Sequence, residues 1–444
     1  MITVIGGGPA GRFAAIYLAR AGEKVRLIEK RGALGGQCLH EGCMVICGLN
    51  DVAKLLDESE KLKKLAVLNS VPEVSLPDIW TEMSKIQSVI SGILDKETKD
   101  AGVEVILGEA FIYGSEVSVD GKILESDSVL IATGSKPYIP DIPGNSLSGV
   151  YTPHTIFKLK ELPKKLLIIG GGVIAAEYSY IFSAFGTDVT IVSRSGFLRD
   201  KPKSLKRATL SDIKRVNVLE YTLLREICGE EKVSSAILEN GGSRYESKCD
   251  AILFASGLTP RTENISGIAK GGNGEILINE NYETSIKGVY AAGDATGMVF
   301  MTPYARMQGL CAAKSILGED VPEIPKCIPQ SIKLFYEHSF CFAPQKDSED
   351  IGETGLPAPS GPGSFWSVPE RNTGRSMIRV EKKSGRVLGM YLGAPSSSVV
   401  ASYMAYLIEN GLKTSDFEKF IEVHPSADGI YSLIKYVNSL VENN

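Results

Sequence analysis

The sequence is poor in cysteine and contains no long apolar run. Eight cysteines among 444 residues are too few for a small secreted fold held together by disulfide bonds. We therefore expect a reducing, cytoplasmic setting in which any disulfide is catalytic or redox-sensing. No uncharged run reaches the roughly 18 residues that a membrane-spanning helix needs. The apolar start does not predict a signal peptide either, because it lacks a basic segment and Arg12 interrupts it.

A large excess of charge of one sign is also missing. The 48 basic residues against 53 acidic ones leave a net charge of −5, which gives no attraction to nucleic acid or to anionic lipid. A hydrophobic share of 43% and a charged share of 23% are ordinary globular values. At about 100–200 residues per domain, the length predicts two to four domains. We expect neither nucleic acid nor a membrane as a partner.

Two segments share a pattern of strand, glycine turn, helix and strand. The short apolar runs are typical of buried parallel strands. The expected strands and helices are Ile2–Ile5, Arg12–Ala21 and Lys24–Glu29 in the first segment, and Lys165–Ile169, Val173–Phe185 and Asp188–Val192 in the second. Two further helices, about Leu49–Leu65 and Asp78–Ala101, are expected between them. The repeat indicates an internal duplication with two nucleotide-binding units in an α/β fold.

The first turn carries the motif Gly6-x-Gly8-x-x-Gly11. Glycine lets the backbone approach a pyrophosphate, and the N-terminus of the following helix favours the anion. Glu29 ends the next strand, where a carboxylate can accept hydrogen bonds from ribose hydroxyls. Because the strand, the helix and the acid follow one another at the expected spacing, the motif predicts a dinucleotide site and not merely a glycine-rich turn.

The second turn carries Gly170-x-Gly172-x-x-Ala175, in which alanine is an accepted small residue at the third position. Ser193 stands as far after Gly170 as Glu29 stands after Gly6, so the acid that would contact the ribose is missing here.

Two arginines, Arg194 and Arg199, lie close to that position. An acid would repel a 2′-phosphate, whereas arginine can pair with it through two hydrogen bonds. The sequence therefore favours NADPH over NADH. The alternative is that both arginines are solvated surface charges.

Cys38 and Cys43 lie five positions apart in the segment GGQCLHEGC, at the start of an expected helix. A helix N-terminus lowers the pKa of a thiol, which makes the thiolate available for exchange. The spacing can close a small disulfide ring. We expect no metal site, because no second cysteine or histidine pair has the spacing of zinc ligands.

Together these motifs resemble those of the flavin-dependent pyridine nucleotide–disulfide oxidoreductases, which include dihydrolipoamide dehydrogenase, glutathione reductase and mercuric reductase. The resemblance covers nearly the whole chain. It implies FAD and NAD(P)H as cofactors, a homodimer, and a small-molecule or small-protein disulfide as substrate. The residues that it assigns to the cofactors are Gly6, Gly8, Gly11, Glu29, Gly36, Gln37, Thr133, Gly134 and Asp294 for FAD, and Gly170, Gly172, Ala175 and Gly257 in the NAD(P) loop and the return to the flavin domain.

The same resemblance implies roles in catalysis. Cys38 is the interchange thiol, and Cys43 is the charge-transfer thiol beside the flavin. Glu177 lies near the nicotinamide. His424 is the acid–base contributed to the neighbouring subunit's disulfide, which suits an imidazole because it titrates near neutrality. The alternative for His424 is a surface histidine at a helix start.

The chain departs from the family pattern at several positions. Cys47 stands where the family has a lysine that pairs with the glutamate near the flavin, and it is either a third redox thiol or a small core residue. Gly429 stands where a glutamate orients the histidine, and Asp428 is a possible substitute. The chain ends at 441–444 without the vicinal cysteines that mercuric reductase uses, which argues against mercury as a substrate.

The remaining cysteines lie on apolar or mixed segments, and buried, inert thiols are the expectation for Cys228, Cys249, Cys311, Cys327 and Cys341. His40, His154 and His338 show no pattern of partners, so we expect surface or core roles for them.

The expected architecture has two Rossmann-like domains and a C-terminal α+β dimerisation domain. The FAD-binding domain comprises 1–147 and 261–322, the NAD(P)-binding domain 148–260, and the dimerisation domain 323–444. The leading functional hypothesis is an NAD(P)H:disulfide oxidoreductase most like dihydrolipoamide dehydrogenase. The missing lysine and glutamate favour an NAD(P)H oxidase or diaphorase-like flavoprotein as the alternative. A catalytically degenerate flavin-binding protein ranks last, because both cysteines and both nucleotide loops are intact.

Overall fold

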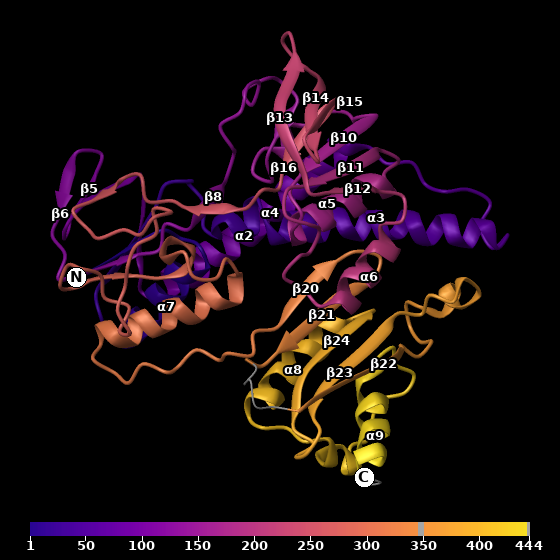
Figure 1. Cartoon of the computed structure of the whole chain (residues 1–444). Helices are drawn as coiled ribbons and strands as arrows, with labels where there is room; N and C mark the ends of the chain where they lie inside the picture. The colour runs from indigo at the N-terminus through magenta and orange to yellow at the C-terminus, as the bar shows by residue number, and fades with distance from the viewer. Residues whose placement is uncertain (345–349, 442–444) are drawn as a thin grey trace. The chain divides into compact units, whose positions relative to one another are not determined.

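The computed structural model describes residues 1–344 and 350–441 (Figure 1). The chain divides into two compact units, each made of three segments. Unit 1 consists of Met1–Gly48, Ser75–Glu161 and Leu253–Ile324, and unit 2 of Leu49–Val74, Leu162–Ile252 and Pro325–Asn444. The three-domain boundaries expected from the sequence stay a prediction. None of the helices in the described ranges is long and apolar enough to cross a membrane.

Unit 1 is built on a parallel sheet of five strands. The central strand β1 (Ile2–Ile5) pairs with β2 (Val25–Glu29) on one side and with β7 (Ser128–Ile131) on the other. The sheet continues with β3 (Glu104–Leu107) beyond β2 and with β19 (Val289–Ala291) beyond β7. All four residues of β1 are buried, which explains why this strand is apolar on both faces.

Two helices of unit 1 pack against each other. The helix α1 (Pro9–Arg20) follows β1, and α7 (Thr302–Ile316) lies along it (Figure 1). A Cβ atom at Gly309 would lie 2.2 Å from the carbonyl oxygen of Ala10, so glycine is required where the two helix backbones meet. This contact fixes the position of α7 relative to the first glycine turn.

Three helices carry or flank the cysteine segment. They are α2 (Gly36–His40), α3 (Cys43–Lys64) and α4 (Leu76–Asp100). The helix α3 begins at Cys43 and not at Leu49 as expected, because Val45 and Ile46 are buried and extend the helix at its N-terminus. The smaller strands of unit 1 are β4 (Ala110–Tyr113), β5 (Glu116–Val119), β6 (Lys122–Leu124), β8 (Ser135–Pro137), β9 (Val150–Tyr151), β17 (Leu258–Pro260) and β18 (Ile265–Ser266).

Unit 2 contains the second nucleotide-binding pattern. Strands β10 (Lys165–Ile169), β11 (Asp188–Ser193) and β12 (Asn217–Glu220) pair in parallel. The helix α5 (Val173–Ala184) follows β10 as α1 follows β1, in agreement with the expected duplication. The further elements are α6 (Lys203–Asp212), the antiparallel strands β13 (Thr222–Gly229), β14 (Val233–Asn240) and β15 (Ser243–Lys248), and β16 (Ala251–Phe254).

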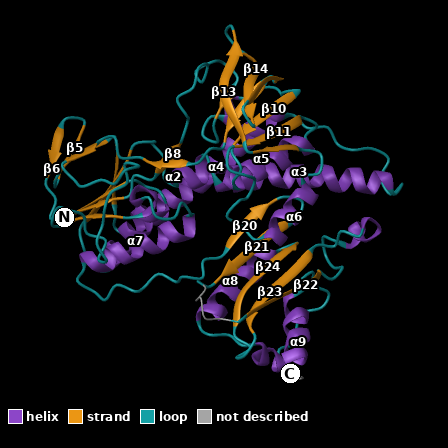
Figure 2. Ribbon diagram, in the orientation of Figure 1, coloured by secondary structure: helices purple, strands orange, loops and turns teal. Residues whose placement is uncertain are grey.

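An antiparallel sheet forms the C-terminal part of unit 2 (Figure 2). In spatial order its strands are β20 (Gln330–Lys333), β21 (Glu337–Phe342), β24 (Val387–Ala394), β23 (Arg375–Glu381) and β22 (Ile351–Pro357). The strand β24 is buried along its whole length. The helix α8 (Ser397–Glu409) packs against β21 and β24, and α9 (Ile430–Val441) packs against β22 and β23. The predicted α/β fold class with a C-terminal α+β part is confirmed.

The contact between α1 and α7 can be tested with Gly309→Ala. The added methyl group would press on the Ala10 carbonyl, and overpacking of this kind costs about 1–3 kcal/mol. We expect a lower midpoint of thermal unfolding. The matched control is Gly92→Ala on α4, where a Cβ atom meets nothing within 4 Å and the better helix propensity of alanine adds up to about 1 kcal/mol. Equal midpoints for Gly309→Ala and the unmodified chain would contradict the packing argument.

Candidate redox and nucleotide sites

The first glycine turn is shaped by backbone contacts that exclude side chains. Gly6 has a φ of 107°, in the region that favours glycine. A Cβ atom at Gly11 would lie 2.0 Å from the carbonyl oxygen of Gly6. Gly8 stands directly before α1, so the N-terminus of α1 opens towards the turn without a blocking side chain. The turn therefore offers backbone N–H groups to an anion.

Glu29 holds this turn in place. One of its carboxylate oxygens accepts the backbone N–H of Gly7 at 2.7 Å, and the other accepts that of Arg31 at 2.7 Å. The side chain is buried at the carboxyl end of β2. Each oxygen keeps a further acceptor position, so the expected hydrogen bond to a ribose hydroxyl is compatible with these contacts.

The residues assigned to the flavin come together around Ser135. The Ser135 hydroxyl donates to Asp294 Oδ2 at 2.6 Å and lies 3.4 Å from Gln37 Oε1. Burial raises the pKa of the Asp294 carboxyl, and the hydrogen bond from Ser135 opposes this shift. Gln37 and Asp294 are far apart in the sequence, yet both contact one hydroxyl.

A second feature of the same region is an unsatisfied hydroxyl. Within the described residues, the buried Oγ1 atom of Thr133 has no hydrogen-bond partner. The neighbouring Gly134 has a φ of 74°. At Gly36, a Cβ atom would lie 2.6 Å from the Cα of Gly8, so the cysteine segment and the first turn touch through glycine. A free donor beside a glycine-lined cradle fits a bound dinucleotide such as FAD.

The two cysteines of the predicted redox pair are in contact. Cys38 lies on α2, and Cys43 is the first residue of α3. Their thiols form a hydrogen bond with each other. The Thr302 hydroxyl, at the start of α7, lies 3.6 Å from Cys43 Sγ. Two helix N-termini therefore meet at the dithiol, which favours a thiolate there.

The electrostatics of the pair assign the negative charge to Cys38. The hydrogen bond from Cys43 is the largest effect and lowers the pKa of Cys38 to about 6, with further help from the Thr302 hydroxyl and the Arg306 cation. Burial and the nearby Cys47 thiol act in the opposite direction. The pKa of Cys43 is raised, chiefly because its thiol hydrogen-bonds to Cys38. These shifts favour the thiolate on Cys38 and the protonated thiol on Cys43.

Thr302 and Arg306 are the residues of this site that the sequence analysis missed. They lie one helical turn apart at the start of α7, so they share a face of the helix. Arg306 is also placed over the ring of Phe13, with 5.2 Å between its guanidinium carbon and the ring centroid. The signal that could have identified the helix start is Thr302-Pro303, because proline is favoured in the first turn of a helix.

Cys47 belongs to the same group of sulfurs. It lies one turn after Cys43 on α3 and is half-buried. Its effect on the pKa of Cys38 places it near the pair. The position where the family has a cation therefore carries a thiol, and a positive charge reaches Cys38 from Arg306 instead.

The second glycine turn differs from the first at its acid position. Ser193 is buried, and a Cβ atom at Gly171 would lie 2.2 Å from its hydroxyl oxygen. Gly172 stands directly before α5, and Ala175 is fully buried on that helix. Gly170 has a φ of 140°. The turn thus has the same open helix start as the first one, with a hydroxyl in place of the carboxylate.

Two arginines lie after β11, beside the second glycine turn. Arg194 is exposed directly after β11. Arg199 is exposed and forms an ion pair with Asp200, with 3.1 Å between Nε and Oδ1.

Gly257 has a φ of 114°, and its carbonyl accepts the backbone N–H of Tyr138 at 2.9 Å. Gly257 therefore lets the backbone turn at this position, as the glycines of the two nucleotide turns do.

Glu177 makes a contact that the sequence did not predict. It is buried on α5, and its Oε1 atom accepts the backbone N–H of Lys333 on β20 at 2.9 Å. Both residues belong to unit 2. The carboxylate thus joins the second nucleotide-binding pattern to the C-terminal sheet.

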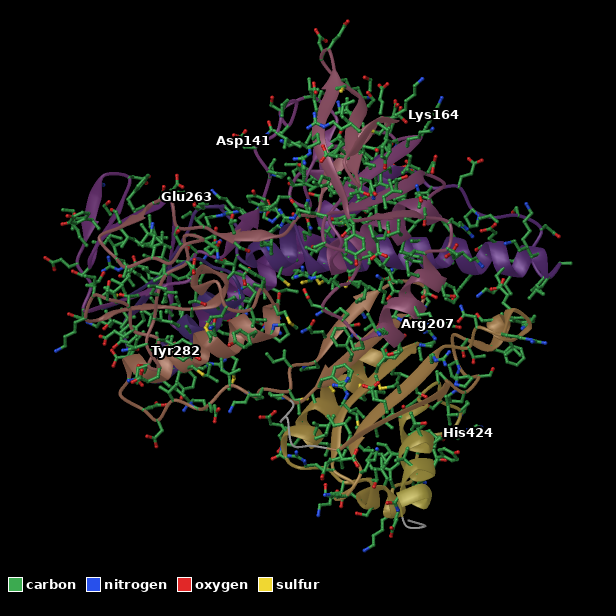
Figure 3. All side chains as sticks on the ribbon, viewed as in Figure 1. Asp141, Lys164, Arg207, Glu263, Tyr282 and His424 are labelled. Atoms are coloured by element: carbon green, nitrogen blue, oxygen red, sulfur yellow. The ribbon has the colours of Figure 1, made fainter. Side chains whose placement is uncertain are left out.

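His424 lies at the surface of the C-terminal part, on the segment before α9 (Figure 3). The possible substitute Asp428 is engaged at the start of the next helix, where its Oδ1 atom accepts the backbone N–H of Ile430 at 2.8 Å. That hydrogen bond caps the start of α9. A Cβ atom at Gly429 would lie 2.9 Å from Ser376 Oγ, so this position is closed to a longer side chain unless the serine moves.

Two other histidines have acidic partners. His154 Nδ1 lies 3.2 Å from Glu41 Oε2, and His338 Nε2 lies 2.8 Å from Asp212 Oδ2. Burial lowers the pKa of His154 to about 4, so its ring is neutral near pH 7. His154 is therefore poorly matched to proton transfer at neutral pH.

The chain is similar along most of its length to proteins of one known family. Residues 1–309 match the family described as pyridine nucleotide-disulphide oxidoreductase. Dihydrolipoyl dehydrogenase of Bacillus subtilis (strain 168) is 28% identical, over 96% of this chain and 95% of that protein. Mercuric reductase of Lysinibacillus sphaericus is 27% identical, over 94% of this chain and 78% of that protein.

The fold is also found among solved structures. The HOCl-induced flavoprotein disulfide reductase RclA from Escherichia coli superposes with a TM-score of 0.85 at 24% identity, over 97% of this chain and 98% of that one. The family and the FAD and NAD(P)H cofactors expected from the motifs are confirmed. The chain belongs to the pyridine nucleotide-disulphide oxidoreductase family and is a flavin-dependent enzyme of that type.

Proposed function

We propose that the enzyme is an NAD(P)H:disulfide oxidoreductase, most like dihydrolipoamide dehydrogenase, that passes electrons through Cys38 and Cys43. The observation that carries this proposal is the hydrogen-bonded thiol pair, in which the pKa of Cys38 is lowered to about 6. When bound, FAD would supply the two-electron chemistry that links NAD(P)H to the disulfide. The residues that would hold it are Gly8, Gly36, Thr133 and Asp294.

The reduced pair then performs thiol–disulfide exchange. The Cys38 thiolate attacks one sulfur of the substrate, which forms a mixed disulfide and releases the first substrate thiolate. Cys43 gives up its proton to that leaving group and attacks the Cys38 sulfur. The Cys38–Cys43 disulfide re-forms and the second substrate thiolate leaves. The substrate is a small-molecule or small-protein disulfide.

Arg306 and Thr302 keep the nucleophile ionised in this scheme. The cation and the hydroxyl both stabilise the Cys38 thiolate, so the reactive form persists down to a pH near 6. Cys47 takes part as a third thiol, since it lies next to the pair on the same face of α3 as Cys43.

A homodimer would bring His424 to the partner's dithiol. Ile421 and Val423, on the same segment, are 89% and 80% exposed. Tyr403 and Tyr406 on α8 are 70% and 69% exposed. Large apolar side chains at this exposure favour a protein partner, and a second copy of this chain is the partner expected for the family. A cytoplasmic location stays an expectation from cysteine usage.

An NAD(P)H oxidase or diaphorase-like activity is the second candidate. Two contacts favour it: Glu177 is engaged with the Lys333 backbone, and Asp428 caps α9. These contacts engage one oxygen of each carboxylate in the fold of unit 2, and Cys47 stands where the family has the lysine that pairs with the glutamate. A degenerate flavin-binding protein ranks last, because both glycine turns and the thiol pair are formed.

The two candidates are separated by Cys38→Ser. The exchange mechanism predicts loss of disulfide reduction by at least about 10²-fold, because a hydroxyl cannot replace the thiolate. Reduction of the flavin by NAD(P)H should persist. The measurement is NAD(P)H oxidation with a panel of lipoamide, glutathione, CoA and small-protein disulfides. Cys249→Ser, at a buried thiol of unit 2, serves as the matched control. Disulfide reduction that continues unchanged in Cys38→Ser would rule the mechanism out.

Arg306→Met tests the electrostatic argument. Removal of the cation destabilises the thiolate, so the pKa of Cys38 should rise by about one unit. The pH profile of iodoacetamide alkylation of the reduced enzyme should shift upward, and the rate at pH 6–7 should fall severalfold. Arg306→Lys keeps the charge and should retain most of the original profile. An unshifted profile in Arg306→Met would show that Arg306 does not act on this thiol.

The preference for NADPH depends on Arg194. In Arg194→Gln we expect KM for NADPH to rise about tenfold while KM for NADH changes little, because only NADPH carries the 2′-phosphate. Anaerobic flavin reduction by each nucleotide is the measurement. Arg199→Gln is the comparison variant, since that arginine already pairs with Asp200. A strong preference of the unmodified enzyme for NADH would be incompatible with the arginine argument.

A further inference from the structure

The core of the C-terminal part contains a second pair of cysteines in contact. Cys327 precedes β20 and Cys341 lies on β21, and their side chains are 2% and 0% exposed. The thiols form a hydrogen bond with each other, as those of Cys38 and Cys43 do. The sequence analysis expected inert, separate thiols at both positions.

Both cysteines belong to one apolar cluster of buried side chains in the C-terminal part. The strands β20 and β21 are antiparallel and pair Gln330 with Phe340. Cys327 stands three residues before β20, at a bend of the chain, and Cys341 lies on β21 next to Phe340. The approach to β20 therefore brings Cys327 into the same buried cluster as Cys341.

Both backbones are held firmly at this point. The backbone N–H groups of Lys326 and Cys327 donate to the two carboxylate oxygens of Glu409, at 3.2 and 2.8 Å. On the other side, Cys341 pairs with Met390 on the buried strand β24. These hydrogen bonds define the backbone positions of both cysteines in the folded protein.

We propose that Cys327 and Cys341 form a second disulfide, which is a structural bond of the C-terminal part and takes no part in turnover. A small-molecule disulfide supplies the oxidising equivalents. The Cys327 thiolate attacks it, forming a mixed disulfide and releasing one thiol. Cys341 then loses its proton to the second leaving thiolate and attacks the Cys327 sulfur. Two protein thiols are oxidised, and one small disulfide is reduced to two thiols.

The order of attack follows from the surroundings. The hydrogen bond from Cys341 lowers the pKa of Cys327, while the pKa of Cys341 is raised. Cys327 is also next to the edge strand β20, where local opening needs the fewest contacts broken. Once formed, the bond is enclosed by an apolar cluster that includes Ile378 and Leu392, which shields it from thiols in solution.

The first test is a peptide map of the full-length enzyme. The protein is purified without reductant, incubated with excess oxidised glutathione, unfolded in guanidinium with N-ethylmaleimide, and digested with trypsin. We expect residues 327–333 and 334–346 as one cross-linked species, because cleavage follows Lys326, Lys333 and Lys346. Alkylation of both cysteines, or glutathione on Cys327 without a cross-link, would overturn the proposal.

The second test separates this bond from the redox pair. The oxidised holoenzyme is reduced anaerobically with excess NADPH or NADH before alkylation. We expect N-ethylmaleimide on Cys38 and Cys43 and an intact cross-link between Cys327 and Cys341. If Cys38 and Cys43 stay unlabelled, the proposed function fails while the structural bond stands. If NAD(P)H opens the 327–341 bond, its structural role fails.

Stability provides an independent readout. In the oxidised state, Cys327→Ser and Cys341→Ser should each lower the midpoint of thermal unfolding by several degrees, since the covalent loop constraint is lost. The control Cys228→Ser should change it little. If either variant fails to fold, the unmodified protein is compared before and after reduction by dithiothreitol, and an unchanged midpoint would count against the bond.

Discussion

The chemistry of this enzyme depends on one proton shared between two sulfurs. Cys38 can be ionised near neutral pH because Cys43 donates a hydrogen bond to it, and that hydrogen bond exists because α2 ends and α3 begins within the same short segment. A third helix completes the arrangement, since α7 brings Thr302 to within 3.6 Å of Cys43 Sγ. The glycine contact between α1 and α7 therefore matters for reactivity, because it fixes the helix that carries Thr302 and Arg306.

Cys47 stands where the family has a lysine, and this changes the position of the positive charge near the thiol pair. A cation on α3 would lie one turn beyond Cys43, on the same helix as that thiol. In this chain the cation comes from Arg306 on α7, and its field lowers the pKa of Cys38. A cation beside Cys38 stabilises its thiolate, so the charge would support the proposed exchange step. Cys47 itself raises the pKa of Cys38 and so works against Arg306, although both effects are smaller than that of the hydrogen bond from Cys43.

The sequence predicted the features that depend on neighbouring residues. The glycine turns, Glu29 and the cysteine segment are local patterns, and each has the expected place at a strand end or helix start. Contacts between distant segments were not predictable in this way. Thr302 meets Cys43 only because α7 returns to α1, and Cys327 and Cys341 come together only in the buried cluster of the C-terminal part. The hydrogen bond from Lys333 to Glu177 likewise requires the fold of unit 2, so no local pattern predicts that carboxylate against a backbone amide.

The two thiol pairs show that the surroundings of a thiol determine its reactivity. In both, one thiol donates to the other and the pKa values move apart. Cys43 is exposed and Cys38 is half-buried, with a hydroxyl and a cation beside them, so exchange with a substrate is open. Cys327 and Cys341 lie in an apolar cluster, and the carboxylate of Glu409 opposes ionisation of Cys327. A disulfide between Cys38 and Cys43 is accessible and lies beside a cation, so it can be reduced and re-formed. A disulfide in the second setting has no approaching nucleophile, so it persists as part of the core.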